Sequence, residues 1–144
     1  MTSEGAELTL PARAESVPPL LDFIAKQLGK VTNNSNITNL TLVSCEEVFA
    51  NILQYAYPDS RGTATVHFEI NSDPKSITIT FIDKGTPYNP LLNAAPDLDL
   101  PPDERDAGGL GIFIIKQSMD HVEYQFVDGK NVLTLTKNIE NVKS

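Results

Sequence analysis

The chain contains 144 residues, of which 40% are hydrophobic and 21% charged, and its formal net charge at pH 7 is -8. This length fits one globular domain, residues 1–144. The acidity disfavours nucleic acid and anionic membrane surfaces as partners, because both attract basic side chains. The first residues do not resemble a signal peptide and no apolar run is long enough to span a membrane, so we expect a cytoplasmic protein.

Two helices are predicted in the first half of the chain, after a short strand at 6–10. The first helix, 17–28, is amphipathic and carries two prolines in its first turn, where proline is tolerated. The second helix, 35–57, follows a polar segment that offers several N-cap residues, and Pro58 ends it.

The second half of the chain predicts four strands, one helix and a long irregular segment. Alternating hydrophobic residues indicate strands at 64–70 and 76–83. The segment 84–107 is rich in proline and acidic residues, and loops of this length are usually functional lids or disordered, so we expect a lid over a binding site here. A helix at 108–119 precedes a hairpin over 122–137, which its Asp-Gly turn strongly indicates.

This order of elements predicts an α+β fold. We expect a two-layer sandwich in which three helices cover one face of a mainly antiparallel sheet. The other face of the sheet, which carries many threonines, would then be exposed to solvent.

Glu47 and Asn51 lie one helical turn apart at the margin of the apolar face of the second predicted helix. A carboxylate there can accept a proton or orient a water molecule, and a carboxamide oxygen can ligate a hard cation such as Mg²⁺. Considered alone, however, the pair is better explained by a solvated Glu47 and by an Asn51 bonded to a neighbouring carbonyl group.

Asp83 ends the second strand of the predicted pair, on the face that is expected to be buried. A buried carboxylate without a partner is costly, so Asp83 needs hydrogen-bond donors. It can cap a turn through the backbone amides of Gly85 or Thr86. It can equally accept a hydrogen bond from the exocyclic amine of adenine, while Gly85 lets the base approach the backbone.

Three glycines, Gly108, Gly109 and Gly111, open the third predicted helix. Amides at a helix N-terminus can bind phosphate oxygens, and the helix dipole favours their negative charge. The pattern is not a Walker motif, because no Gly-Lys-Ser/Thr follows, and glycine pairs also occur as simple hinges.

The three motifs occur in a fixed order: a helix with Glu-x-x-x-Asn, a strand ending in Asp-x-Gly-x-Pro, and a helix that opens with Gly-Gly-x-Gly. This ordered set resembles the Bergerat-type ATP-binding fold of the GHKL superfamily, which is shared by gyrase, heat-shock protein 90, histidine kinases and MutL. The segments 46–57, 83–90 and 108–115 look closest to the anti-sigma factor serine-protein kinases. The resemblance covers nearly the whole chain.

The resemblance implies a serine-protein kinase that uses ATP and Mg²⁺. Glu47 would be the general base, and Asn51 would hold Mg²⁺ at the phosphates. Asp83 would bind the adenine amine, with Gly85 lining the base pocket. The remaining site residues would contact the phosphates: Gly108, Gly109, Gly111 and, late in the lid, Arg105.

The resemblance also implies partners. The substrate would be a serine on a small anti-sigma-factor antagonist protein, the second partner would be a sigma factor that is held by sequestration, and the kinase would be a homodimer. The chain departs from the family at Tyr55, where many relatives carry histidine, and in its acidic lid.

Two other functions compete with this interpretation. The first is an ATP-binding regulatory module that binds a partner without useful phosphoryl transfer. The second, a sensor histidine kinase, is disfavoured because its phosphorylated histidine normally lies in a preceding helical region. Here His67 and His121 are the two histidines, and both fall on or beside predicted strands.

Overall fold

The computed structural model describes residues 3–57, 59, 61–72, 75–92 and 107–139. Within these residues one antiparallel sheet has the strand order β1-β2-β3-β5-β4. Its strands are β1 (Ser3–Pro11), β2 (Thr63–Ser72), β3 (Lys75–Asp83), β4 (His121–Val127) and β5 (Lys130–Asn138). The two hairpins, β2–β3 and β4–β5, are those that the sequence predicts.

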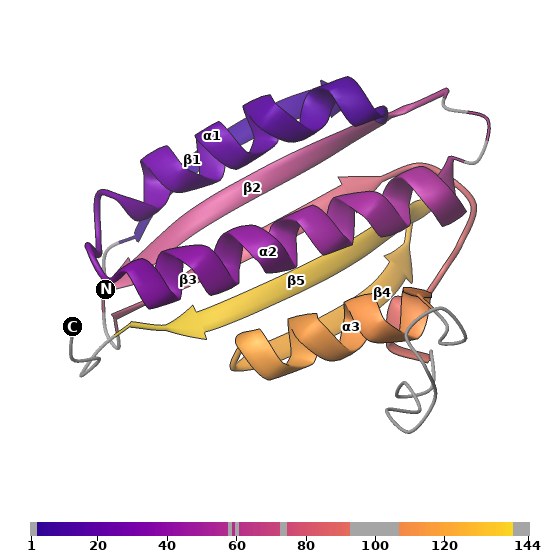
Figure 1. Ribbon diagram of the computed structural model, residues 1–144. Coiled ribbons are helices and arrows are strands. Elements are labelled where there is room, and N and C mark those ends of the chain that lie inside the picture. The colour runs from indigo at the N-terminus through magenta and orange to yellow at the C-terminus, as the bar shows by residue number, and fades with distance from the viewer. Residues whose placement is uncertain (1–2, 58, 60, 73–74, 93–106, 140–144) are drawn as a thin grey trace.

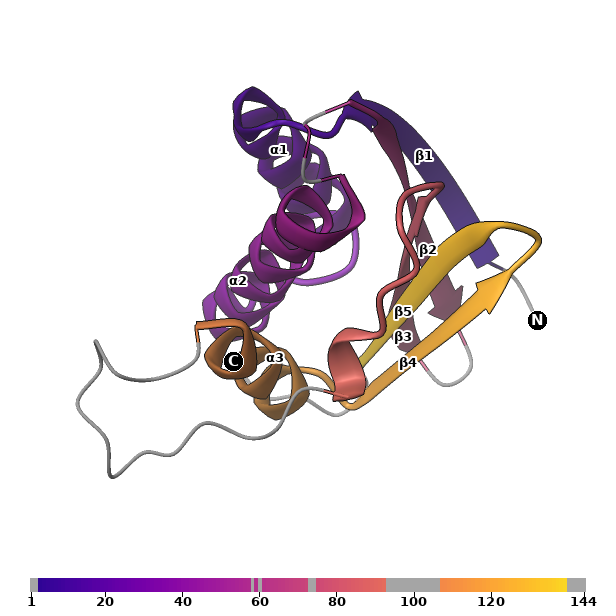
Figure 2. The same cartoon turned by 90° about the vertical axis from the view of Figure 1, so that its right-hand side faces the viewer.

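Three helices cover one face of this sheet (Figures 1 and 2). They are α1 (Val17–Leu28), α2 (Ser35–Asn51) and α3 (Ala107–Ser118), and two short 3-10 turns, η1 (Ala14–Ser16) and η3 (Pro90–Leu92), precede α1 and follow β3. The predicted α+β sandwich is therefore confirmed. The start of α2 agrees with its local chemistry, since Asn34 caps the helix by accepting a hydrogen bond from the amide of Ile37 at 3.1 Å.

The core lies between the helices and the sheet, and its largest fully buried side chains are aromatic: Phe49, Phe68 and Phe81. Cys45 is buried among the core residues, and burial raises the pKa of its thiol, so it packs as a small hydrophobic residue. The opposite face of the sheet carries many polar side chains, and the hydroxyls of Thr9 and Thr65 form a hydrogen bond of 2.9 Å there, across β1 and β2.

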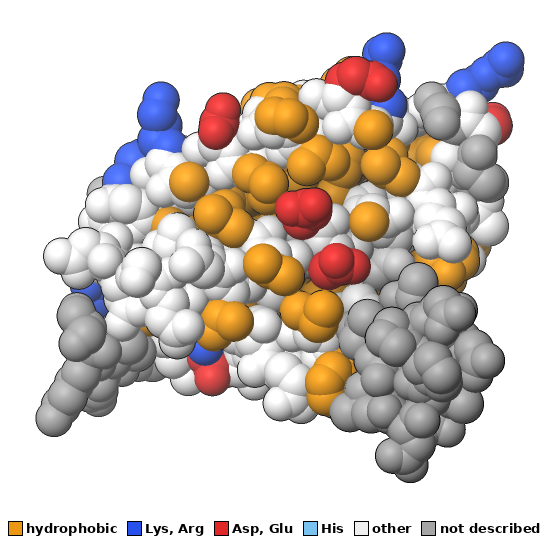
Figure 3. All heavy atoms as spheres, in the orientation of Figure 1, with side chains coloured by type: hydrophobic (Ala, Val, Ile, Leu, Met, Phe, Trp, Pro, Cys, Tyr) orange, Lys and Arg blue, Asp and Glu red, His pale blue; other side chains and the backbone are white. Residues whose placement is uncertain are grey.

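The outer surface of the helical layer carries hydrophobic side chains interspersed with acidic ones (Figure 3). Leu42 of α2 and Leu53, two residues after its end, pack partly against the core, and Phe49 of α2 is fully buried. Val43, next to Leu42, has an exposed fraction of 44%. Among the described residues, no helix combines the length and hydropathy that a membrane-spanning segment needs.

The second helix differs from the prediction at its C-terminus. α2 ends at Asn51, and a π-helical turn, η2 (Ile52–Ala56), replaces the expected last turns. The amide of Tyr57 closes this turn on the carbonyl of Ile52 at 3.1 Å, while the carbonyl of Ala56 accepts a hydrogen bond of 2.9 Å from the amide of Thr86. This contact with a segment 30 residues later in the chain cannot be predicted from helical periodicity.

The predicted lid, 84–107, is only partly covered by the structure. Residues 84–92 are described and include η3. Residues 93–106, among them Arg105 and the acidic residues of the lid, lie outside the described residues.

Candidate functional site

A cavity lies between the C-terminal end of α2 and the ends of β3 and β5 where Asp83 and Asn131 pair. Asn51 and Asp83, which belong to separate sequence motifs, both line it. Most of the other lining side chains are hydrophobic or aromatic, among them Val48, Phe81 and Leu133. An apolar cavity with a few convergent polar groups is typical of a small-molecule site.

Asp83 is 5% exposed, and one of its carboxylate oxygens, Oδ1, is held by two donors. The amide of Gly85 donates to Oδ1 at 2.9 Å, and the side-chain Nδ2 of Asn131 donates to the same oxygen at 2.9 Å. The capping bond to Gly85 that the sequence suggests is therefore present. Asp83 also lines the cavity, so the same carboxylate can cap the turn and still contact a ligand.

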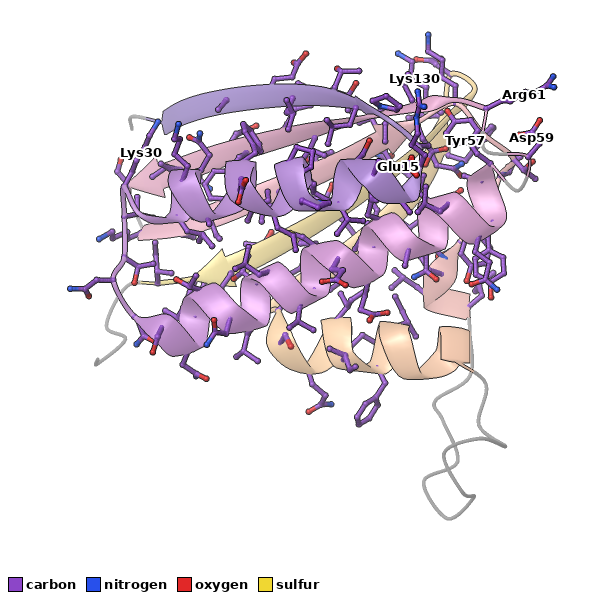
Figure 4. All side chains as sticks on the ribbon, turned by 45° about the horizontal axis from the view of Figure 1, so that its top comes forward. Glu15, Lys30, Tyr57, Asp59, Arg61 and Lys130 are labelled. Carbon is purple, nitrogen blue, oxygen red and sulfur yellow. The ribbon has the colours of Figure 1, made fainter. Side chains whose placement is uncertain are left out.

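The segment after Asp83 is packed tightly against the end of α2. A Cβ atom at Gly85 would lie 2.3 Å from the carbonyl oxygen of Ala56, so only glycine fits between β3 and η2. Tyr57 adds a second link, because its hydroxyl donates to the carbonyl of Thr63 at 3.0 Å and accepts from the amide of Lys84 at 2.8 Å. Figure 4 shows Tyr57 at the same end of the sheet as Lys130, the residue before Asn131.

Tyr88 extends the cavity wall and lies against η2. Its ring stacks on that of Tyr55, with a centroid separation of 4.2 Å and an interplanar angle of 22°. Tyr55 therefore packs against the segment that follows β3. The stack joins the helical layer to the loop after β3.

Glu47 is half-buried and lies one turn before Asn51 on α2. A Cβ atom at Gly111 of α3 would lie 2.6 Å from Oε2 of Glu47, so glycine at this position leaves room for the carboxylate against the helix. Burial raises the pKa of Glu47, and the negative charge of Glu46 raises it further. The structure thus brings the carboxylate of the first motif to the glycine-rich helix of the third.

Asn51 is 9% exposed, and its buried Nδ2 atom has no hydrogen-bond partner in the part of the chain that the structure describes. A buried amide donor that lacks a partner is costly, and such groups are rare in native proteins. Because Asn51 also lines the cavity, it is a polar group positioned to bind something that the protein itself does not supply.

The structure describes Gly108 and Gly109 at the start of α3 only by their backbone, and it does not describe Arg105. Both glycines lie in the first turn of α3, as the sequence predicts. His67 and His121 lie on strands and pair with acidic neighbours: Nε2 of His67 is 3.3 Å from Oε1 of Glu7, and Nε2 of His121 is 3.8 Å from Oε2 of Glu123. These pairs agree with a structural role.

Two residues of the cavity wall, Asn131 and Tyr124, were not predicted from the sequence. Asn131 is buried beside Asp83, and Tyr124 of β4 donates a hydrogen bond from its hydroxyl to Oδ1 of Asn131. Burial raises the pKa of Tyr124, so its phenol keeps the proton that it donates. In the sequence Asn131 follows an Asp-Gly turn and is indistinguishable from an ordinary turn residue. Only the register between β3 and β5 places it opposite Asp83.

Comparison with known proteins gives relatives that cover most of the chain. A serine/threonine-protein kinase, BtrW, of Bordetella bronchiseptica is 29% identical over 99 residues, which are 68% of this chain and 69% of the relative. Serine-protein kinases named RsbW, from Halalkalibacterium halodurans and Bacillus mycoides, are 29% and 26% identical over 95% of this chain, and 85% and 86% of their own lengths are covered.

A solved structure supports the fold. The RsbU and RsbW domains of Rv1364c from Mycobacterium tuberculosis match 97% of this chain with a TM-score of 0.67 at 14% sequence identity, and this chain spans 35% of that longer one. The family model of the histidine kinase-like ATPase domain matches residues 10–137. The resemblance inferred from the three motifs is confirmed, and the chain belongs to the histidine kinase-like ATPase domain family.

Proposed function

We propose that the chain is an ATP-dependent serine-protein kinase whose site comprises Glu47, Asn51, Asp83 and the glycine-rich start of α3. The observation that carries the proposal is the meeting of the three motifs. Asn51 and Asp83 line one cavity, and Glu47 lies against Gly111. The names of the relatives, serine-protein kinases, favour this activity over other reactions of ATP-binding proteins.

The residues present fit a nucleotide with its metal ion. The Nδ2 of Asn51, which has no hydrogen-bond partner among the described residues and belongs to a residue of the cavity wall, is a donor that a polar ligand would complete. Within the described ranges, no group of three or more His, Cys, Asp or Glu side chains could hold a metal ion. We therefore propose that the carboxamide oxygen of Asn51 is a protein ligand of Mg²⁺ and that phosphate oxygens supply other ligands. Bound there, Mg²⁺ would neutralise charge on the phosphates.

For the transfer itself we assign Glu47 as the general base that accepts the proton of the attacking serine hydroxyl. Its raised pKa makes the carboxylate a stronger base than an exposed one. The amides of Gly108, Gly109 and Gly111, with Arg105, would bind the phosphates. Such transfer depends mainly on positioning and on charge stabilisation, so this small set of groups is chemically sufficient.

For the base we assign Asp83 as the acceptor of the adenine amine, with Gly85 lining the pocket. The described hydrogen bonds to Asp83 fall on Oδ1, which leaves Oδ2 as an acceptor for a ligand. The hydrophobic and aromatic side chains of the same cavity suit a flat heterocycle.

The partners in this proposal come from the family resemblance. The substrate is a serine on a small anti-sigma-factor antagonist, and the kinase regulates a sigma factor by holding it in a complex. The acting form is a homodimer.

The test combines binding with transfer. Calorimetry of the protein with ATP and Mg²⁺ should give saturable binding, and labelled ATP should phosphorylate a candidate antagonist from the same organism. An antagonist whose acceptor serine is replaced by alanine should remain unlabelled. Failure to bind ATP at millimolar concentration would overturn the whole proposal. Binding of ATP and antagonist without labelling would instead establish a regulatory module without kinase activity.

A further inference from the structure

Asn131 uses every hydrogen-bonding position of its side chain. It is 6% exposed and pairs directly with Asp83 across β3 and β5. Its Nδ2 donates to Oδ1 of Asp83 at 2.9 Å and to the carbonyl of Thr86 at 3.0 Å. Its Oδ1 accepts from the amide of Tyr88 at 3.1 Å and from the hydroxyl of Tyr124. An asparagine side chain has two donors and two acceptor sites, so none is left over.

This single side chain therefore connects three elements around the cavity. It joins the carboxylate at the end of β3 to the loop that follows it, and it is itself held from β4 by Tyr124. A fully satisfied buried network fixes the orientation of its members more strongly than isolated pairs do. The orientation of the Asp83 carboxylate thus depends on Asn131.

The arrangement makes the two oxygens of Asp83 unequal. Oδ1 accepts from both Gly85 and Asn131, whereas no hydrogen bond among the described residues ends on Oδ2. Rotation of the carboxylate would break both bonds to Oδ1. Oδ2 is therefore an acceptor of fixed position on a residue that lines the cavity.

We infer that Asn131 is a positioning residue that makes the site select purines bearing an amine at carbon 6 over those bearing an oxygen there. The inference rests on the proposed nucleotide site. An amine donates to Oδ2, while a carbonyl oxygen would oppose it with a second acceptor and leave both without a donor. By fixing Oδ2, Asn131 prevents the carboxylate from turning away to relieve that mismatch.

The test compares the affinities for ATP and inosine triphosphate, which differ in whether carbon 6 carries an amine or an oxygen. The wild type should prefer ATP by about 100-fold. Asn131→Leu keeps the approximate volume and removes the amide. It should weaken ATP binding about 10- to 100-fold and inosine triphosphate binding less than about threefold, so the preference collapses. A purely structural role for Asn131 would weaken both nucleotides equally, and an unchanged preference overturns the inference.

Tyr124→Phe provides a second variant if Asn131→Leu does not fold. It removes only the hydroxyl that binds Oδ1 of Asn131, and it should lower the preference for ATP about threefold. If the preference of this variant equals that of the wild type, Asn131 does not act through its network.

Asn138→Leu is the matched control, because Asn138 is an exposed asparagine at the other end of β5. It should leave both affinities unchanged. The two proposals fail in different ways: a wild type that binds neither nucleotide overturns the proposed function and this inference together. A wild type that prefers ATP, with the same preference in Asn131→Leu, overturns only the inference.

Discussion

The two halves of the candidate site differ in how completely the protein itself supplies hydrogen-bond partners for their polar groups. Around Asp83 the polar groups are paired: Gly85, Asn131, Tyr57 and Tyr124 form hydrogen bonds that fix the carboxylate and the loop after it. Around α2 the opposite holds. The buried Nδ2 of Asn51 has no partner among the residues that are described, and burial together with the charge of Glu46 raises the pKa of Glu47.

This difference separates two tasks of one site. The paired half is preorganised and can recognise a ligand without rearranging, which lowers the cost of binding. The unpaired half costs stability in the free protein, and such a cost is typical of residues retained for chemistry. Substitutions in the first half should therefore lower affinity or stability, whereas those in the second should lower transfer.

The largest effect is expected for phosphoryl transfer by Glu47→Gln. Glutamine keeps the shape of the side chain but cannot accept the serine proton, so the rate of transfer should fall about 10²- to 10⁴-fold. ATP affinity should change less than about threefold, because the base acts on the acceptor rather than on the nucleotide. Single-turnover labelling of the antagonist, with calorimetry of ATP binding, measures both.

Glu69→Gln is the control, since Glu69 is an exposed glutamate on β2 and is not one of the groups that raise the pKa of Glu47. It should transfer phosphate at nearly the wild-type rate. Equal labelling by wild type and Glu47→Gln would remove Glu47 from the mechanism and with it the division of the site into a recognition half and a reaction half.

The second effect concerns recognition. In Asp83→Asn the amide oxygen should take the position of Oδ1, because Gly85 and Asn131 both donate there, and an NH₂ group would replace Oδ2. A donor would then face the adenine amine, and ATP affinity should fall about 100-fold by calorimetry. Asp120→Asn, at an exposed carboxylate that binds the amide of Asn138, should bind ATP like the wild type.

The third effect is on stability. Gly85→Ala would bring a Cβ atom within 2.3 Å of the carbonyl oxygen of Ala56, and this backbone contact can be relieved only if η2 or the loop shifts. The free energy of unfolding should fall by about 2 kcal/mol, which corresponds to a decrease in Tm of about 4–8 °C. Gly5→Ala should change Tm by less than about 2 °C, because its Cβ would meet the carbonyl oxygen of Phe68 at an ordinary 3.9 Å. Similar Tm values for the two variants would contradict the tight packing at Gly85.

Local patterns predicted most of the fold. The sandwich, the three helices and both hairpins follow from hydrophobic periodicity and turn residues, and Asn34 acts as the cap of α2 through a local hydrogen bond. The parity of β3 also predicted that Asp83 is buried. These features depend on residues close together in the chain.

The parts that were not predicted depend on contacts between distant segments. The π-helical turn η2 was missed because the carbonyl of Ala56 accepts a hydrogen bond from the amide of Thr86, which lies 30 residues further along the chain. The helical periodicity of 35–57 does not indicate where the α-helix gives way to this turn. Asn131 was missed because its role follows from its position opposite Asp83 across two strands. A polar residue next to a turn carries no local sign of such a partner.

The smallest predicted effect is the change in stability that Glu47→Gln causes. It tests directly how much stability the charge of Glu47 costs in the folded protein. Because the pKa of Glu47 is raised in the folded protein, the folded state holds this proton more tightly than the unfolded chain does. The free energy of unfolding of the wild type should therefore fall as the pH rises from about 4.5 through the pKa of the folded state. Above that pKa the loss of stability is complete and stays constant. Glu47→Gln has no such charge, so its Tm at pH 7.5 should exceed that of the wild type by about 1–3 °C. The difference should shrink toward pH 4 in thermal unfolding curves. A Tm gain that is the same at both pH values would show that the carboxylate charge is not the source of the cost.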